Sequence, residues 1–122
     1  MRRSCLSVLL VTFLVLGFGL TAHAYEGTGL DLTGTEWQKS SQGEKLAFLY
    51  GASSVVAIEQ LIADRQGTSP SPFVQAWGKA FNNLSWIELQ QLIDKWYAEH
   101  PNDSGRQVFD VLWWEYMLPA KK

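Results

Sequence analysis

Three short motifs constrain the fold of this chain more than any other feature, because each one marks the start of a helix. They are Ser41-x-x-Glu44, Ser85-x-x-Glu88 and Ser104-x-x-Gln107. In such a capping box the serine hydroxyl accepts a hydrogen bond from the backbone N–H three residues later, and the longer side chain reaches back to the serine N–H. The motifs therefore predict three helices after residue 40.

Helix-breaking residues predict where these helices end, and they separate a fourth helix from the others. Glycine, proline and asparagine interrupt the apolar patterns at Gly67, Pro70, Asn82, Pro101 and Pro119. Between the interruptions we expect helices over 41–63, 73–82, 85–100 and 104–118. No segment alternates apolar and polar residues with a period of two. The predicted fold class is therefore all-α, a compact four-helix domain.

The helix expected over 41–63 is apolar on nearly every side. At 100° per residue, its large side chains point in three different directions, represented by Leu49, Tyr50 and Val55. A helix that is apolar all round is usually buried on most sides, so we expect this one at the centre of the domain. The small residues of Gly51–Ser54 weaken its helix propensity, and we expect another helix to approach closely there.

The first 24 residues have the three-part layout of a secretory signal peptide. Arg2 and Arg3 provide the positive start, an apolar run follows over 6–20, and Ala22-His23-Ala24 places small residues before the cleavage position. A retained membrane anchor is the alternative, but the apolar run is short for a membrane span and contains polar residues. We therefore expect an exported protein, periplasmic or secreted, that does not contact the membrane after cleavage.

Cleavage after Ala24 would leave 98 of the 122 residues, which is the size of one domain. We expect a glycine-rich extended lead-in over 25–40 and a single helical domain over 41–122. Cys5 leaves with the signal peptide, so the mature chain has no thiol, and its only histidine is His100. All six tryptophans remain. Because each large ring buries about 150–250 Å², aromatic packing can replace the disulfides that small exported domains often use.

The composition argues against most kinds of chemistry. The mature chain has eight Lys and Arg residues against twelve Asp and Glu residues, and it has no basic cluster that would bind nucleic acid. No group of Cys, His and carboxylate residues has the spacing of a metal site, and no phosphate-binding or dinucleotide-binding loop occurs. We therefore predict a protein without cofactor, metal or catalytic residues.

The histidine His100 has two interpretations. As a general base it would need a carboxylate, such as Asp94 or Asp103, to orient its ring. As a structural residue it would lie at the C-terminal end of a helix, where the helix dipole favours a partly positive imidazole. Pro101 marks that helix end, so we favour the structural interpretation and expect that the protein is not an enzyme.

The helix expected over 104–118 carries an apolar ring on its outer side. Its predicted core face consists of Val108, Phe109, Leu112, Trp113 and Tyr116. Trp114 lies nearly opposite, where it is either covered by the lead-in or exposed as a contact surface, since Trp and Met are enriched in protein interfaces. The candidate residues of a partner surface are Trp114, Asp110, Met117 and Trp37.

Several phrases in the second half of the chain resemble a known family. The stretch over 84–101 ends in Tyr97-Ala98-Glu99-His100-Pro101, and the last predicted helix ends in Leu118-Pro119. These residues resemble the C-terminal half of the Rap/Tai family, small periplasmic immunity proteins of type VI secretion systems. In addition, Glu44-Lys45-x-x-Phe48-Leu49-x-Gly51 is similar to the first helix of related exported proteins, many of which have no assigned function.

The resemblance implies an all-α periplasmic protein that binds and blocks a secreted effector that degrades the cell wall, often as a homodimer. Family members usually have paired cysteines that close a disulfide, whereas the mature chain here has none. A second function therefore stays open, in which an exported domain binds a small apolar ligand or acts as a periplasmic chaperone. The first hypothesis expects an exposed contact surface, and the second expects a pocket between the helices.

Overall fold

The computed structural model describes residues 31–120, and these residues form helices with no strand among them. The helices are α2 (Gly34–Lys39), α3 (Gln42–Gln66), α4 (Pro72–Phe81), α5 (Trp86–Glu99), the 3-10 turn η1 (Pro101–Asp103), α6 (Val108–Val111), the π-helical turn η2 (Leu112–Met117) and α7 (Leu118–Ala120). The predicted all-α class is confirmed for this part of the chain. The expected signal peptide over 1–24 lies outside the described residues.

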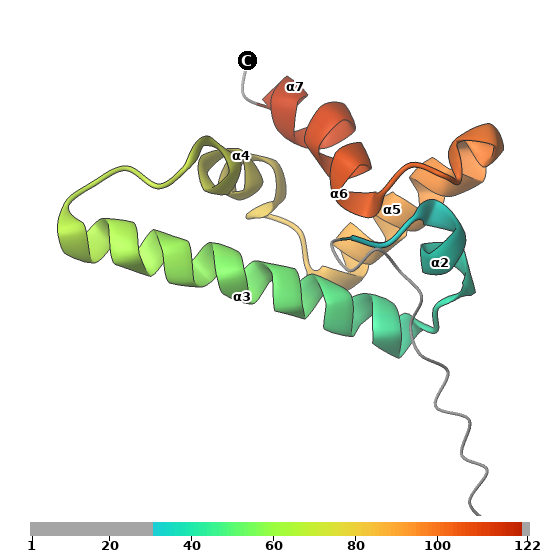
Figure 1. The fold of residues 1–122 in the computed structure, drawn as a ribbon, viewed down its shortest axis with the longest axis horizontal. Helices are drawn as coiled ribbons and strands as arrows, with labels where there is room; N and C mark the ends of the chain where they lie inside the picture. The colour runs from blue at the N-terminus through green and yellow to red at the C-terminus, as the bar shows by residue number, and fades with distance from the viewer. Residues whose placement is uncertain (1–30, 121–122) are drawn as a thin grey trace, which may run out of the picture.

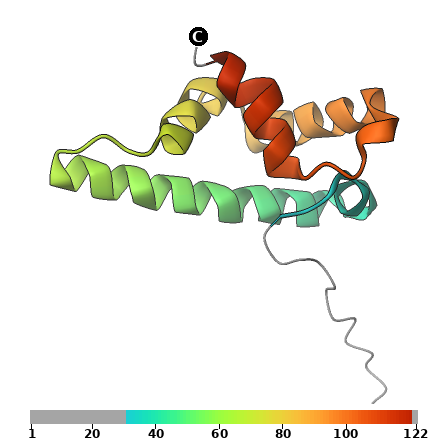
Figure 2. The same ribbon diagram turned by 45° about the horizontal axis from the view of Figure 1, so that its top comes forward.

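The helices are arranged on one side of α3. Figures 1 and 2 show α3 along one edge of the molecule, with α4, α5 and the last helical segment on the same side of it. The last segment runs continuously through α6, η2 and α7 and packs against α4. The fully buried core lies among these elements and includes Trp37, Leu49, Leu89, Ile93, Tyr97, Val108, Val111, Leu112 and Met117.

The expectation that the long helix is central and buried on most sides is wrong. Of the 25 residues of α3, only Leu49 and Ala63 are buried. Large apolar side chains of this helix are exposed, namely Tyr50, Val55, Ile58, Leu61 and Ile62. A helix that is apolar all round gives no sign of which side faces the core, and in this fold the other elements cover one side only.

Two of the three capping boxes are confirmed. In α3 the Ser41 N–H donates to the Glu44 carboxylate at 2.7 Å, and in α5 the Ser85 N–H donates to Glu88 at 2.7 Å, with the reciprocal hydroxyl bonds also formed. A fourth box, Thr33-x-x-Glu36, starts α2 in the same way and is absent from the sequence-based prediction. These bonds explain why the helices begin where they do, because each satisfies two otherwise unpaired N–H groups.

The third predicted box, at Ser104, is wrong. The last helix begins at Val108, and neither Ser104 nor Gln107 caps it through a side chain. Instead the carboxylate of Asp31 accepts a hydrogen bond from the Phe109 N–H at 2.8 Å. Because the free N–H groups at a helix N-terminus favour a negative charge, Asp31 replaces the missing local cap from 78 residues away in the sequence.

The lead-in expected to be extended over 25–40 is part of the fold from residue 31 onwards. Its residues 34–39 form α2. Its backbone forms two hydrogen bonds with the segment at the start of α6: the Gly34 N–H donates to the Arg106 carbonyl at 2.9 Å, and the Leu32 carbonyl accepts from the Val108 N–H at 2.8 Å. The boundary predicted at residue 41 is therefore too late, because part of the core comes from Trp37 in α2.

The π-helical turn changes which residues of the last helix are buried. Met117, expected on the outer side, is fully buried, as are Val108 and Leu112 on the predicted core face. Val111, which precedes the π-turn and is not on the predicted core face, is also fully buried. A π-turn contains one more residue than an α-turn, so side chains five positions apart, such as those of Leu112 and Met117, align along the helix. The helix also continues through Pro119 to Ala120, so the expected stop at that proline is wrong.

Candidate binding surfaces

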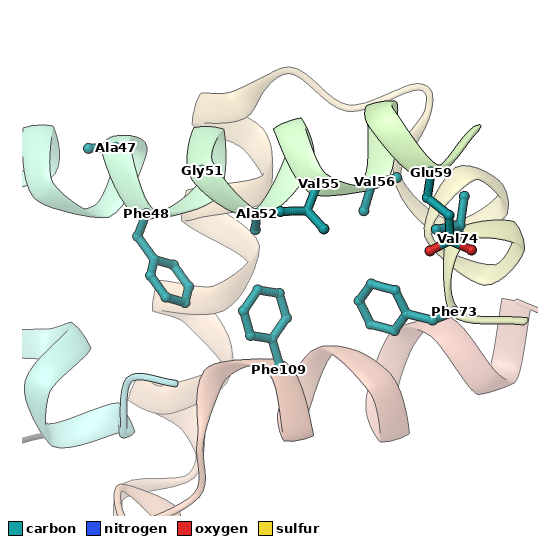
Figure 3. Close-up of a pocket in the computed structure, with 10 residues that line it drawn as sticks. All are labelled: Ala47, Phe48, Gly51, Ala52, Val55, Val56, Glu59, Phe73, Val74 and Phe109. Atoms are coloured by element: carbon teal, nitrogen blue, oxygen red, sulfur yellow. The ribbon is translucent and has the colours of Figure 1, made fainter. Parts of the chain in front are cut away.

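An open apolar cleft of about 500 Å³ lies between α3, the start of α4 and α6. Three phenylalanine rings point into it from these three elements, Phe48 from α3, Phe73 from α4 and Phe109 from α6 (Figure 3). The ring centroids of Phe48 and Phe109 are 5.3 Å apart, and those of Phe73 and Phe109 are 6.4 Å apart. The remaining lining residues are Ala47, Gly51, Ala52, Val55, Val56, Glu59 and Val74.

Local sequence explains why the cleft is open. Gly51 and Ala52 have short side chains at the point where α3 faces the three rings, and a Cβ added to Gly51 would meet nothing within 4 Å. The helix expected to approach Gly51–Ser54 closely is not found among residues 31–120, so that prediction is wrong within the described chain. The hydroxyl groups of Ser53 and Ser54 instead donate to the Tyr50 carbonyl, at 2.9 and 2.8 Å.

The only charged residue that lines this cleft is Glu59. Its carboxylate accepts a hydrogen bond from the Ser71 N–H at 2.7 Å and so connects α3 to the N-terminus of α4. Hydrogen bonds from Ser71 lower the pKa of Glu59 below its usual value, which keeps it ionised at neutral pH. The carboxylate therefore stabilises the contact between α3 and α4. The surface that the cleft presents to a binding partner is apolar and aromatic.

The four residues predicted as a partner surface do not lie together. Trp114 is 58% exposed, and Asp110 forms an ion pair with Arg106 at 2.7 Å. Trp37 and Met117 are fully buried, so neither can belong to an exposed surface of this fold. The described part of the lead-in, residues 31–40, does not cover Trp114.

Trp37 is buried at the edge of a polar cluster centred on Asp94. One carboxylate oxygen of Asp94 accepts hydrogen bonds from the Trp37 indole N–H at 2.7 Å and from the Lys45 ammonium at 2.8 Å, and the other accepts from Gln90 at 3.0 Å. Burial opposes ionisation of Asp94, but the bonds from Lys45, Gln90 and Trp37 outweigh it, so its pKa is lower than usual. The cluster links α2, α3 and α5.

His100 stacks on Trp96 at the C-terminus of α5, with the ring centroids 4.3 Å apart. Its Nδ1 is 2.7 Å from the Trp96 carbonyl oxygen, and the Arg106 guanidinium lies 5.1 Å from the Trp96 ring centroid. Asp94, one of the two carboxylates considered as its partner, is engaged by α2 and α3 instead. The imidazole therefore has the contacts expected of a residue that ends a helix.

The outer side of α3 is a second apolar surface, and sequence reasoning missed it by placing this helix in the core. Ile58 and Leu61 are 59% and 49% exposed on it. By length and composition alone, α3 is apolar enough to cross a membrane, with a mean hydropathy of 1.6 over its best window. Among residues 31–120, no group of three or more His, Cys, Asp or Glu side chains is placed to hold a metal ion.

Comparison with protein-family models, with curated proteins and with solved structures finds no match to this chain. The cleft and the outer side of α3 are the apolar surfaces of the described chain that bear on binding.

Proposed function

We propose that this protein is an exported, non-catalytic binding protein whose apolar cleft receives an apolar segment of a secreted effector, as in an immunity protein. The cleft carries the proposal, because it combines three phenylalanine rings with a single carboxylate that is already hydrogen-bonded to Ser71. Aromatic pockets that exclude water are where most binding energy is concentrated in protein complexes. An open cleft also suits a chain segment better than an enclosed cavity would.

The chemistry of the cleft supports binding over catalysis. A catalytic site needs a nucleophile or a proton-transferring group within hydrogen-bond reach of its substrate. Glu59 is the only cleft residue with a titratable side chain, and its carboxylate already accepts a hydrogen bond from the Ser71 N–H. The resemblance of the stretch over 84–119 to the Rap/Tai family and the signal-peptide layout of residues 1–24 supply the periplasmic setting and the class of partner.

A matched pair of variants tests the proposal, with a secreted cell-wall-degrading effector, sought among the products of the neighbouring genes, as the partner. The full chain, co-expressed, should protect cells from that effector in the periplasm and should co-purify with it. Val55→Asp places a charge at the cleft, and we expect it to weaken the complex at least about ten-fold, since burying an unpaired charge is costly. Val55 is 68% exposed, so the fold should tolerate the change.

Ile87→Asp is the control, because Ile87 is 49% exposed on α5 and does not line the cleft. It should leave protection and co-purification unchanged. If the wild-type chain neither binds nor protects, or if both variants behave alike, the cleft is not the effector site.

A second candidate function is the binding of a small apolar ligand, and the size of the cleft favours it. Small-molecule sites usually have volumes of about 300–1,000 Å³, a range that includes this cleft at about 500 Å³. A long-chain alkyl probe should then bind the wild-type protein with one-to-one stoichiometry and bind Val55→Asp more weakly. Absence of saturable binding would eliminate this candidate without affecting the first.

A further inference from the structure

A pocket of about 270 Å³ lies between the C-terminal end of α4 and the N-terminal end of α5. Three aromatic side chains line it, Trp77 and Phe81 from α4 and Trp86 from α5. The ring centroids of Trp77 and Phe81 are 5.1 Å apart in an edge-on arrangement, and the Trp86 ring contacts that of Tyr50 in α3 at 4.9 Å. This aromatic pocket shares no lining residue with the cleft between α3 and α6, so the two sites are separate.

Gly78 lines the aromatic pocket at a position where the fold does not require a glycine. It lies inside α4, where glycine lowers helix stability relative to alanine. Among the described residues only Gly67 has a positive φ, and a Cβ built on Gly78 would meet nothing within 4 Å. Neither the backbone conformation nor close packing therefore explains this glycine. Its missing side chain leaves space in the pocket.

The electrostatics of the aromatic pocket favour a positive charge. Aromatic faces are negative and attract a cation within about 6 Å of the ring centroid, and tryptophan does so most strongly. The pocket lies at the C-terminal end of α4, where the helix dipole also favours a cation. No charged side chain of the described residues lines it. Lys79, in the last turn of α4, is exposed and is not among the lining residues, so it does not fill the pocket.

We infer that the aromatic pocket binds a small organic cation of the quaternary ammonium class. A primary ammonium group would lose its water here without a carboxylate to replace it, because no carboxylate of the described residues lines the pocket. A quaternary ammonium group carries its charge on methyl groups, which pack against aromatic rings. The side-chain amide of Asn82, which also lines the pocket, can bond a hydroxyl group on the same molecule. This inference does not depend on the proposed function of the cleft.

Calorimetric titration with choline tests the class of ligand. The reference compound is dimethylbutanol, the uncharged isostere in which a carbon atom replaces the choline nitrogen. We expect choline to bind the chain with one-to-one stoichiometry and at least about ten-fold more tightly than the isostere, because the charge contributes to binding. Absence of saturable choline binding, or equal affinity for the two compounds, would overturn the inference.

Two pairs of variants test the place of binding. Gly78→Leu fills the pocket and should weaken choline binding at least about ten-fold, while urea unfolding shows a stability no lower than that of the wild type, since leucine has the higher helix propensity. Gly43→Leu is the control, because a Cβ there also meets nothing within 4 Å and Gly43 does not line the pocket. Trp86→Leu should likewise weaken binding, whereas Trp114→Leu, at an exposed tryptophan outside the pocket, should not. Unchanged binding in Gly78→Leu and Trp86→Leu would overturn the inference.

A quaternary ammonium group can come from a dissolved solute or from a lipid headgroup, and vesicles of phosphatidylcholine separate these two sources. Binding of free choline without binding of vesicles supports a dissolved ligand. Co-sedimentation of the wild-type chain with vesicles, lost in both Gly78→Leu and Trp86→Leu, supports a headgroup. Vesicle binding that neither variant weakens, together with no binding of free choline, would overturn the inference and assign the membrane contact to another surface.

Discussion

At the scale of single residues, the close contact between Gly34 and Tyr97 leaves no room for a larger side chain at position 34. A Cβ placed on Gly34 would overlap the ring of Tyr97, which is fully buried and donates its hydroxyl to the Arg106 carbonyl at 2.9 Å. Tyr97 therefore cannot move away without breaking that bond. The glycine is needed for close approach of α2 to α5.

We predict that Gly34→Ala lowers the free energy of unfolding by about 2–3 kcal/mol, as expected for overpacking in a rigid site. Urea unfolding followed by tryptophan fluorescence measures this change. Gly43→Ala is the matched control, because a Cβ there meets nothing within 4 Å, and it should leave stability unchanged or raise it slightly. Equal effects of the two substitutions would show that α2 does not pack against Tyr97 in this way.

A second prediction at this scale concerns acid stability. Because the pKa of Asp94 is lowered in the folded state, its contribution to stability is present above the unfolded pKa of about 3.9 and is lost as the pH falls through the folded pKa. Asp94→Asn should lower the free energy of unfolding by about 1–2 kcal/mol at pH 7. This value is at the low end for hydrogen bonds to a charged group, because the carboxylate is partly exposed to solvent.

Unfolding curves measured between pH 7 and pH 3 should therefore show a smaller difference between Asp94→Asn and wild type as the pH falls. Asp64→Asn is a suitable control, because Asp64 is exposed and its side chain has a single hydrogen-bond partner, Gln60, on the same helix. A difference for Asp94→Asn that stays constant with pH would mean that the carboxylate is not held by Lys45, Gln90 and Trp37.

At the scale of helices, the start of the last helix depends on a residue far away in the sequence. We predict that Asp31→Ala lowers stability by about 1–2 kcal/mol, the usual cost of removing an N-cap. Ser104→Ala, which removes the cap predicted from the local motif, should cost little, because Ser104 contributes its carbonyl to Thr35 through the backbone. A larger loss from Ser104→Ala in urea unfolding would reverse this assignment.

The helices themselves were largely predictable from the sequence, because their signals are local. The boxes at Ser41 and Ser85 and the breaks near Gly67 and Asn82 depend on neighbouring residues only. The failures come from longer-range effects. Asp31 caps α6 across the fold, and the π-turn at Leu112–Met117 shifts the helical phase that had placed Met117 outside. The Thr33-x-x-Glu36 box is also a local motif, but the neighbouring glycines favoured the prediction of an extended segment there.

At the scale of the whole molecule, the sequence did not reveal where the surfaces lie. Because α3 is apolar on all sides, its sequence is compatible with a position at the centre of the fold or at its edge. The arrangement of the other helices places it at the edge. The cleft residues Phe48, Phe73 and Phe109 come from three separate elements, so no motif joins them. Trp114, by contrast, was placed on the outer side by simple periodicity, and it is exposed.

Methyl NMR of the chain mixed with a secreted cell-wall-degrading effector, sought among the products of the neighbouring genes, tests the proposed binding site most directly. We predict that the methyl signals of Val55, Val56 and Val74, which line the cleft, shift on binding. Those of Val108 and Val111, which are fully buried in the core, should change little. An effector that binds while the signals of the three cleft valines stay unchanged, or one that does not bind at all, would show that the cleft is not the binding site.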